Sequence, residues 1–232
     1  MITPDAAYWS TVQQARAIKE GKFSSRELLE LLVERESLIN ENLNAVVTLD
    51  LDRARLAADA ADEALAAGRS YGPLHGIPVT IKDALETKGL RSTGGATELS
   101  DYVPNRDAPV VDAIKRAGAI VFGKTNLPRW SGDIQSYNEI FGTTVNPWNS
   151  ERVPGGSSGG AAAAVSAGLT SFEIGTDIGG SIRFPASFCG IYGHKPSFGI
   201  VPSTGYLDHR HGGMTEADVN VIGPLARSAD DL

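Results

Sequence analysis

The chain has 232 residues but only one cysteine, Cys189, so it can form no internal disulfide. Aromatic residues make up only 7% of it, and its uncharged, alanine-rich stretch over residues 160–172 is too short and too weakly apolar to cross a bilayer. The first ten residues contain Asp5 and no basic cluster, so we predict no signal peptide. These features favour a cytoplasmic protein without a membrane partner.

Positive charge is also scarce, because 28 acidic residues outnumber 21 lysine and arginine residues and the net charge is −7. An acidic protein repels nucleic-acid backbones and anionic lipids, so we expect neither as a partner. His209 and His211 stand close together, but no cysteine or carboxylate pattern accompanies them, so we expect no metal site. The balance of 41% hydrophobic and 21% charged residues is ordinary for a globular protein.

Helix and strand patterns alternate along the chain. Ser24 and Glu27 predict a capping box at the start of one helix, and Asp107 is expected to cap another. Helices are expected over residues 51–67, 107–118 and 160–168. Strands are expected over residues 76–81, 119–122 and 170–174. This alternation predicts an α/β protein, with an N-terminal helical segment over residues 1–70 and a core over residues 71–232.

Two serines set among glycines stand 24 positions apart. Ser157 lies in residues 155–160 (GGSSGG), and Ser181 ends residues 177–181 (DIGGS). Glycine leaves room for a substrate to approach a hydroxyl nucleophile, and its free N–H groups can stabilise an oxyanion. A serine nucleophile needs a base, and Lys82, which follows an apolar run, could serve if burial lowers its pKa. Pairs of serine and lysine are an accepted variant of triad chemistry.

Together these residues resemble the amidase signature family of Ser-Ser-Lys amide hydrolases. The resemblance runs from about Ser24 to the C-terminus, and it also rests on residues 123–126 (GKTN), 146–148 (NPW) and 193–197 (GHKPS). It implies the amidase signature fold, a central mixed twisted sheet with helices on both faces. Members are longer than this chain, and residues 228–231 carry a helix-capping signal with no helix after it. We therefore expect the chain to be the N-terminal part of a longer protein.

The resemblance also implies a role for each matching residue. Lys82 would be the base, Ser157 a bridging serine that follows a cis peptide bond, and Ser181 the nucleophile that becomes acylated. The implied oxyanion hole consists of the N–H groups of Ile178, Gly179, Gly180 and Ser181. The residues implied to support this loop are Asp177, Arg183 and Ser158. The implied reaction is hydrolysis of a small carboxylic amide without a cofactor.

Substrate contacts are harder to predict than the catalytic residues. The segment over residues 203–219 is expected to line the substrate pocket, with Tyr206, His209 and Arg210 as predicted contacts. Many relatives carry an acid where this chain has Arg129. A homodimer is one assembly that the sequence allows.

Two other segments satisfy the sequence expressions of well-known functional motifs. Residues 118–125 satisfy the P-loop expression, but the four residues that should wrap a phosphate, 119–122, read as a strand. Residues 155–159 satisfy the nucleophile-elbow expression, which would make Ser157 the nucleophile and Asp208 and His209 its partners. The strand expected before such an elbow is missing, because residues 148–154 are polar and turn-like. We therefore regard both motifs as chance matches.

Two further alternatives keep the family motifs. The chain could resemble the amidase component of a tRNA-dependent amidotransferase, whose members usually read Ile-Arg-Gln-Pro after the nucleophile. This chain has Phe184 in place of that glutamine, which favours a stand-alone amidase. The chain could also be a truncated scaffold or binding protein that has kept the motifs without the activity.

Overall fold

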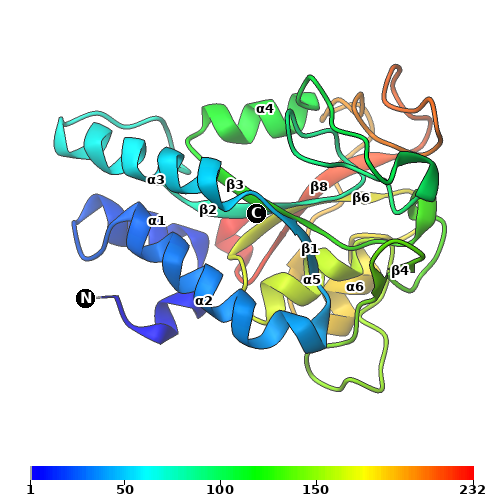
Figure 1. Cartoon of the computed structure of the whole chain (residues 1–232), viewed down its shortest axis with the longest axis horizontal. Coiled ribbons are helices and arrows are strands. Elements are labelled where there is room, and N and C mark those ends of the chain that lie inside the picture. Colours follow the sequence, from blue (N-terminus) through cyan, green and yellow to red (C-terminus); the bar gives the residue numbers. More distant parts are fainter. Residues whose placement is uncertain (1) are drawn as a thin grey trace.

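A six-stranded mixed sheet lies at the centre of the computed structural model, which describes residues 2–232 (Figure 1). Its strands, in spatial order, are β1 (Val46–Leu49), β3 (Ile120–Thr125), β2 (Pro78–Lys82), β6 (Phe172–Asp177), β8 (Val221–Ala226) and β7 (Tyr192–Gly193). β2 runs parallel to its neighbours β3 and β6, and the other pairings are antiparallel. A separate two-stranded ribbon consists of β4 (Tyr137–Asn138) and β5 (Gly142–Thr143). The sheet therefore places the ends of β2 and β6 side by side.

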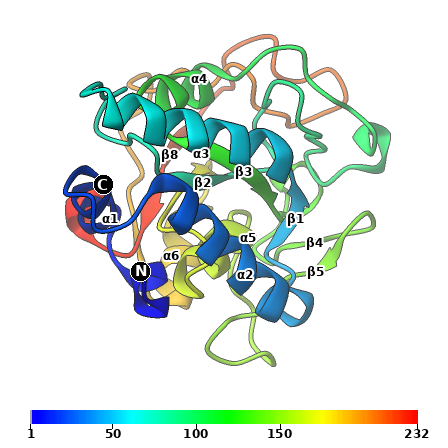
Figure 2. The same ribbon diagram turned by 60° about the vertical axis from the view of Figure 1, so that its left-hand side comes forward.

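Helices cover both faces of this sheet. The α-helices are α1 (Thr11–Lys19), α2 (Ser25–Leu43), α3 (Leu51–Ala66), α4 (Pro109–Arg116), α5 (Gly159–Ser166) and α6 (Arg183–Cys189), and the 3-10 helices are Pro4–Tyr8, Thr97–Leu99, Arg129–Ser131 and Ala229–Asp231. In both ribbon views α3 and α4 lie on one side of the sheet, and α5 and α6 lie on the other (Figures 1 and 2). The expected mixed α/β fold is confirmed. No helix within residues 2–232 is long and apolar enough to span a membrane.

Local signals placed α2 correctly. The Ser24 hydroxyl accepts a hydrogen bond from the Glu27 N–H, and the Glu27 carboxylate accepts one from the Ser24 N–H, which completes the expected capping box. The apolar stripe that follows, Leu28, Leu29 and Leu32, is fully buried in the main hydrophobic core. This stripe joins α2 to α3 and to the sheet.

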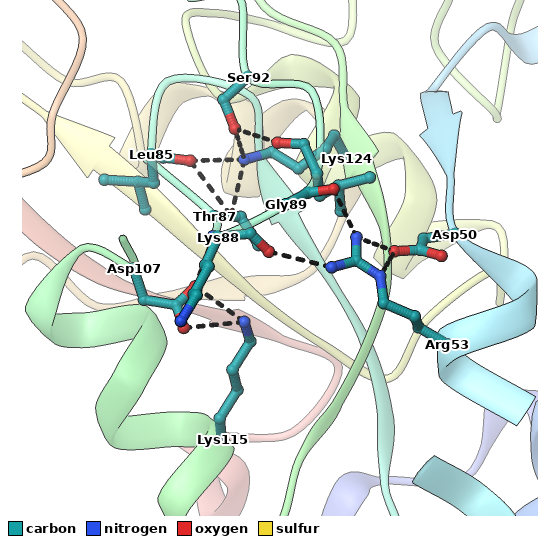
Figure 3. A network of polar contacts seen from close by, with 11 residues as sticks. Asp50, Arg53, Leu85, Thr87, Lys88, Gly89, Ser92, Asp107, Lys115 and Lys124 are labelled. Carbon is teal, nitrogen blue, oxygen red and sulfur yellow. Dashed lines mark hydrogen bonds and ion pairs between the residues drawn. The ribbon is translucent and has the colours of Figure 1, made fainter. Parts of the chain in front are cut away.

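The prediction that Asp107 caps α4 was wrong. Ala108 occupies the N-cap position, and no side chain caps the helix. The Asp107 carboxylate instead accepts hydrogen bonds from the backbone N–H of Lys88 and from Nζ of Lys115, each at 2.8 Å (Figure 3). Asp107 stands two residues before Pro109, near both the helix N-terminus and other donors. Its carboxylate binds the Lys115 ammonium and the Lys88 N–H rather than the N–H groups at the start of the helix.

β3 and β6 extend several residues past their predicted ends, each of which lies just before a glycine. β3 continues through Gly123 to Thr125, and β6 continues through Gly175 to Asp177. A Cβ atom on Gly123 would lie 2.8 Å from the carbonyl oxygen of Thr48, and one on Gly175 would lie 2.9 Å from the Ser158 hydroxyl. These glycines are therefore sites of close approach within strands.

Strands β1, β7 and β8 of the central sheet were not predicted, and neither was the ribbon of β4 and β5. β1 has only four residues between the left-handed turn at Asn44 and the start of α3, so its pattern is too short to identify. β8 contains Gly223 and Pro224, which argue against a strand when they are read locally. β1 and β8 pair with β3 and β6, which are distant in sequence, and β7 in turn pairs with β8.

Helix α5 consists mostly of glycine and alanine, and all of its residues except Ser166 are buried. A Cβ atom on Gly160 would lie 2.4 Å from the backbone nitrogen of Asn126, so only glycine allows this approach. The helix begins directly after the serine pair 157–158. Its small side chains let these serines come close to the ends of β2 and β6.

Candidate active site

Lys82 is the last residue of the central strand β2 and is completely buried. Its Nζ donates hydrogen bonds to the hydroxyl oxygens of Ser157 and Thr176, both at 2.7 Å. Ser157 comes from the segment before α5, and Thr176 is the penultimate residue of β6. Two of the three predicted catalytic residues are thus in direct contact, although they stand far apart in the sequence.

Burial changes the charge of this lysine. It lowers the pKa of Lys82 to about 7, although the negative charges of Glu173 and Asp177 act in the opposite direction. An ordinary lysine is almost fully protonated at neutral pH, whereas at a pKa of about 7 a large share of the molecules carries the free amine. A free amine that contacts a serine hydroxyl can accept its proton.

The peptide bond between Gly156 and Ser157 is cis, as the resemblance implied. Ser158, the second serine of the pair, is also fully buried, and its hydroxyl makes hydrogen bonds of 3.3 Å to both the N–H and the carbonyl of Thr176. The Ser158 N–H donates to the carbonyl oxygen of Ser181 at 3.1 Å. Ser158 therefore links the serine-rich segment both to the end of β6 and to the predicted nucleophile.

The turn that carries Ser181 is organised around the buried carboxylate of Asp177. This carboxylate accepts hydrogen bonds from the N–H groups of Gly180 (2.7 Å) and Ile182 (3.1 Å). It also forms a two-point ion pair with the guanidinium of Arg183, at 3.0 and 2.9 Å. Burial raises the pKa of Asp177, but these hydrogen bonds outweigh burial and hold the pKa below its ordinary value. Asp177 thus holds the backbone of this turn in place, and Arg183 pairs with it.

These contacts change the set of free oxyanion donors. The N–H of Gly180, one of the four predicted donors, is already occupied by Asp177. Within residues 2–232, the N–H groups of the other three predicted donors, Ile178, Gly179 and Ser181, donate to no protein acceptor. Gly179 is also exposed, and Ser181 is half-buried. Among the described residues, the turn therefore keeps three N–H groups without a protein acceptor at or next to Ser181 in the sequence.

One link of the predicted relay is not made directly. Among the residues that the structure describes, no hydrogen bond joins the hydroxyl of Ser181 to that of Ser157. The two serines are instead connected through the backbone contact between Ser158 and Ser181.

The comparison with known families agrees with this geometry. The family model described as Amidase matches residues 27–232. The chain belongs to the amidase signature family. The matched region begins in α2 and includes Lys82, both serine motifs and every strand of the sheet.

Relatives within the amidase signature family include two cyanobacterial proteins that are named as subunits of glutamyl-tRNA(Gln) amidotransferase. The chain is 42% identical to the one from Synechococcus sp. (strain CC9311) and 47% identical to the one from Prochlorococcus marinus (strain MIT 9313). Each match covers 92% of this chain but 43% of the relative. The chain therefore spans less than half the length of these curated relatives.

Solved structures of amidase signature enzymes have the same fold. Fatty acid amide hydrolase matches with a TM-score of 0.88 and 30% identity, over 100% of this chain and 41% of that protein. The peptide amidase from Stenotrophomonas maltophilia matches with a TM-score of 0.86 and 33% identity, over 96% of this chain and 46% of that protein.

The sequence analysis did not identify two buried polar residues of the site, Thr176 and Glu173. Thr176 directly precedes Asp177 in the nucleophile motif, and this adjacency is the one signal that could have revealed it. Glu173 is completely buried, and its Oε1 accepts a hydrogen bond of 2.6 Å from the Thr125 hydroxyl. Its signal is an acid within an apolar strand, Phe-Glu-Ile-Gly.

The structure excludes the P-loop interpretation, as the sequence analysis expected. Residues 120–125 form strand β3, so they cannot wrap a phosphate. Lys124 is fully buried, and its Nζ donates to the carbonyl oxygen of Leu85 and to the hydroxyls of Thr87 (2.9 Å) and Ser92 (3.1 Å) (Figure 3). Lys124 therefore has a structural role, because its hydrogen bonds anchor the segment after Lys82 to β3.

The nucleophile-elbow interpretation also fails. The Ser157 hydroxyl contacts Lys82, and no strand leads into Ser157, because residues 147–153 form turns. His209 does pair with Asp208 at 2.6 Å, but this pair lies on an exposed loop. In residues 2–232 no group of three or more metal-binding side chains comes together.

The predicted substrate contacts fall into two environments. Tyr206 is 2% exposed, so its phenol could contact only a substrate that enters the protein, whereas His209 and Arg210 are exposed. Arg129, the departure from the family pattern, forms an ion pair with Glu98 and lies over the ring of Trp130. The structure therefore gives Arg129 a local partner.

Proposed function

We propose that this chain carries the catalytic residues of an amidase that hydrolyses a small carboxylic amide through an acyl-enzyme on Ser181. The observation that supports this most strongly is the 2.7 Å contact between Nζ of Lys82 and the Ser157 hydroxyl in a fully buried site. A lysine with a pKa of about 7 in such a contact is suited to act as a base. The proposed chemistry uses no cofactor.

In the proposed reaction, neutral Lys82 takes a proton from Ser157, and Ser157 takes one from Ser181. The Ser181 oxygen attacks the amide carbonyl, and the N–H groups of Ile178, Gly179 and Ser181 stabilise the oxyanion. The carbon–nitrogen bond breaks as Ser157 protonates the leaving nitrogen and regains a proton from Lys82. Water then hydrolyses the ester by the same relay, which releases the acid and restores Ser181.

Labelling with a fluorophosphonate probe tests this proposal without knowledge of the substrate. We expect a single adduct, located on Ser181 by mass spectrometry, and no adduct in the Ser181→Ala variant. An adduct on Ser157 would support an elbow-type nucleophile instead. If the folded chain carries no adduct, the scaffold alternative replaces the proposal.

The rate of this labelling should depend on pH through Lys82. Its ammonium form cannot accept a proton, so the rate should rise as the lysine deprotonates and level off above its pKa. We expect the midpoint near pH 7, because burial lowers the pKa of Lys82 to about 7. Labelling rates measured between pH 5.5 and 9 provide the check, and a rate that still rises steeply at pH 9 would argue for an ordinary lysine.

The second candidate is an amidotransferase component that takes ammonia from glutamine for a partner. The names of the two curated relatives favour it, and it would require partners that include tRNA. Phe184 argues against it, since its ring lies against Gly180 where the usual motif has glutamine. Ammonia release from glutamine and from a simple aliphatic amide, compared at equal concentration, distinguishes the two candidates.

A further inference from the structure

Glu173 is a buried carboxyl group that the proposed mechanism does not use. It is completely buried at the second position of β6. Its Oε1 accepts the hydrogen bond from Thr125, but its Oε2 has no hydrogen-bond partner within residues 2–232. Burial of a carboxyl group with an unpaired oxygen is costly, so its presence in the core needs a reason.

The sheet register places Glu173 on the same face as the proposed base. Thr80 pairs with Glu173 across β2 and β6, and Lys82 pairs with Thr125 across β2 and β3. Side chains alternate between faces along a strand, so Thr80 and Lys82 point to the same side. Glu173, Thr125 and Lys82 therefore share one face of the sheet. They are not in direct contact as an ion pair, so any influence acts through the surrounding low-dielectric interior.

Few other charges act on this buried region. The strand and helix that pack most extensively against β6 besides β2 are β8 and α5, and neither contains a charged residue. The charges that influence Glu173 are those of Lys82 and of Lys124, which lies next to Thr125 on β3. Asp177, at the end of β6, is the other anion that acts on Lys82. Two acids therefore act on Lys82. Asp177 is in direct contact with the Arg183 guanidinium, whereas Glu173 contacts no cationic side chain among the described residues.

We propose that Glu173 is a positioning residue for the base, and that its buried carboxylate stabilises the ammonium form that Lys82 adopts after taking the proton from Ser157. This inference rests on the proposed function. Burial raises the pKa of Glu173 to about 7, although the nearby hydroxyls of Thr125 and Thr80 and the charges of the two lysines oppose the rise. Glu173 and Lys82 therefore change charge over the same pH range, and each affects the titration of the other.

The first test compares pH profiles of Ser181 labelling in the wild type and in Glu173→Gln. Glutamine keeps the shape and can still accept the hydrogen bond from Thr125, but it cannot carry the charge. Without the anion the ammonium form of Lys82 is less stable, so we expect the midpoint to fall by about 1 pH unit. The maximal rate should fall roughly threefold, because the base becomes weaker. Glu173→Asp, which keeps the charge, should restore the midpoint at least in part.

The matched control is Glu86→Gln. Glu86 is also buried, but its carboxylate binds the hydroxyl of Tyr102 and the guanidinium of Arg106. It is not one of the acids that act on Lys82. Its replacement should leave the midpoint unchanged. A Glu173→Gln variant that is folded, as judged by circular dichroism, and has the wild-type midpoint would overturn the proposal.

The second test needs no catalytic activity, so it separates this inference from the proposed function. The side-chain carboxyl carbon of Glu173 can be followed by NMR in chain labelled with carbon-13 glutamate, with the signal assigned by its loss in Glu173→Gln. Because electrostatic coupling is reciprocal, Lys82→Met should raise the titration midpoint of Glu173. An unchanged midpoint would refute the coupling. If Lys82→Met raises the midpoint of Glu173 but the wild-type chain is not labelled at Ser181, the coupling is supported and the proposed function is rejected.

Discussion

Replacement of Lys82 by methionine is expected to slow labelling of Ser181 by about a thousandfold, because the relay loses its base. The wild-type Nζ is buried and contacts Ser157 and Thr176, so no solvent base can take its place. Methionine has a similar length and no charge to desolvate, so the variant should fold. Labelling rates of folded protein at pH 8 provide the measurement.

The matched control for this variant is Lys124→Met. Lys124 is equally buried on the neighbouring strand, but it binds Leu85, Thr87 and Ser92 rather than either catalytic serine. We expect it to lower the melting temperature and to leave the labelling rate of folded molecules within tenfold of wild type. If both lysine variants lost labelling equally, the effect would be general to the core, and Lys82 would lose its assigned role.

Replacement of Asp177 by alanine is expected to lower the free energy of unfolding by about 3 kcal/mol and to abolish labelling of Ser181. The carboxylate is the common acceptor for the N–H groups of Gly180 and Ile182 and for the Arg183 guanidinium. Its removal leaves these donors without a partner and releases the turn that positions the nucleophile. Urea denaturation and labelling of the folded fraction measure the two effects separately.

Arg183→Gln serves as the comparison, because the same ion pair is broken from its exposed side. The Arg183 side chain is 53% exposed, so in the variant water can solvate the Asp177 oxygens that Arg183 contacted. The N–H groups of Gly180 and Ile182 keep this carboxylate as their acceptor. A loss below about 1 kcal/mol is expected for an exposed pair. Equal losses in the two variants would mean that the ion pair, rather than the backbone anchoring, holds the turn.

The family and the fold could be predicted from the sequence because their signals are local. The glycine-set serines, the lysine at the end of an apolar run and the capping box of α2 are all readable within a few residues. The family and the mixed α/β fold are confirmed. The roles of Lys82, Ser157 and Ser181 remain predictions, supported by the contact between the first two.

What could not be predicted depends on contacts between distant segments. Glu173 reads as an ordinary charged residue until pairing with β2 and β8 buries it. Gly123 and Gly175 read as breaks until the close approaches of Thr48 and Ser158 are known. The N–H of Gly180 looked free to stabilise an oxyanion until Asp177 was found to occupy it.

The position of β6 in the sheet also sets an order of events when the chain is made. β6, which leads into the nucleophile turn, is bordered by β2 on one side and by β8 on the other. β8 is synthesised well after Ser181, so the turn emerges from the ribosome while one edge of β6 is still open. An open, apolar strand edge invites pairing with other chains. Nascent molecules should therefore be most vulnerable to aggregation, and most dependent on chaperones, in the interval between the synthesis of Asp177 and that of Ala226.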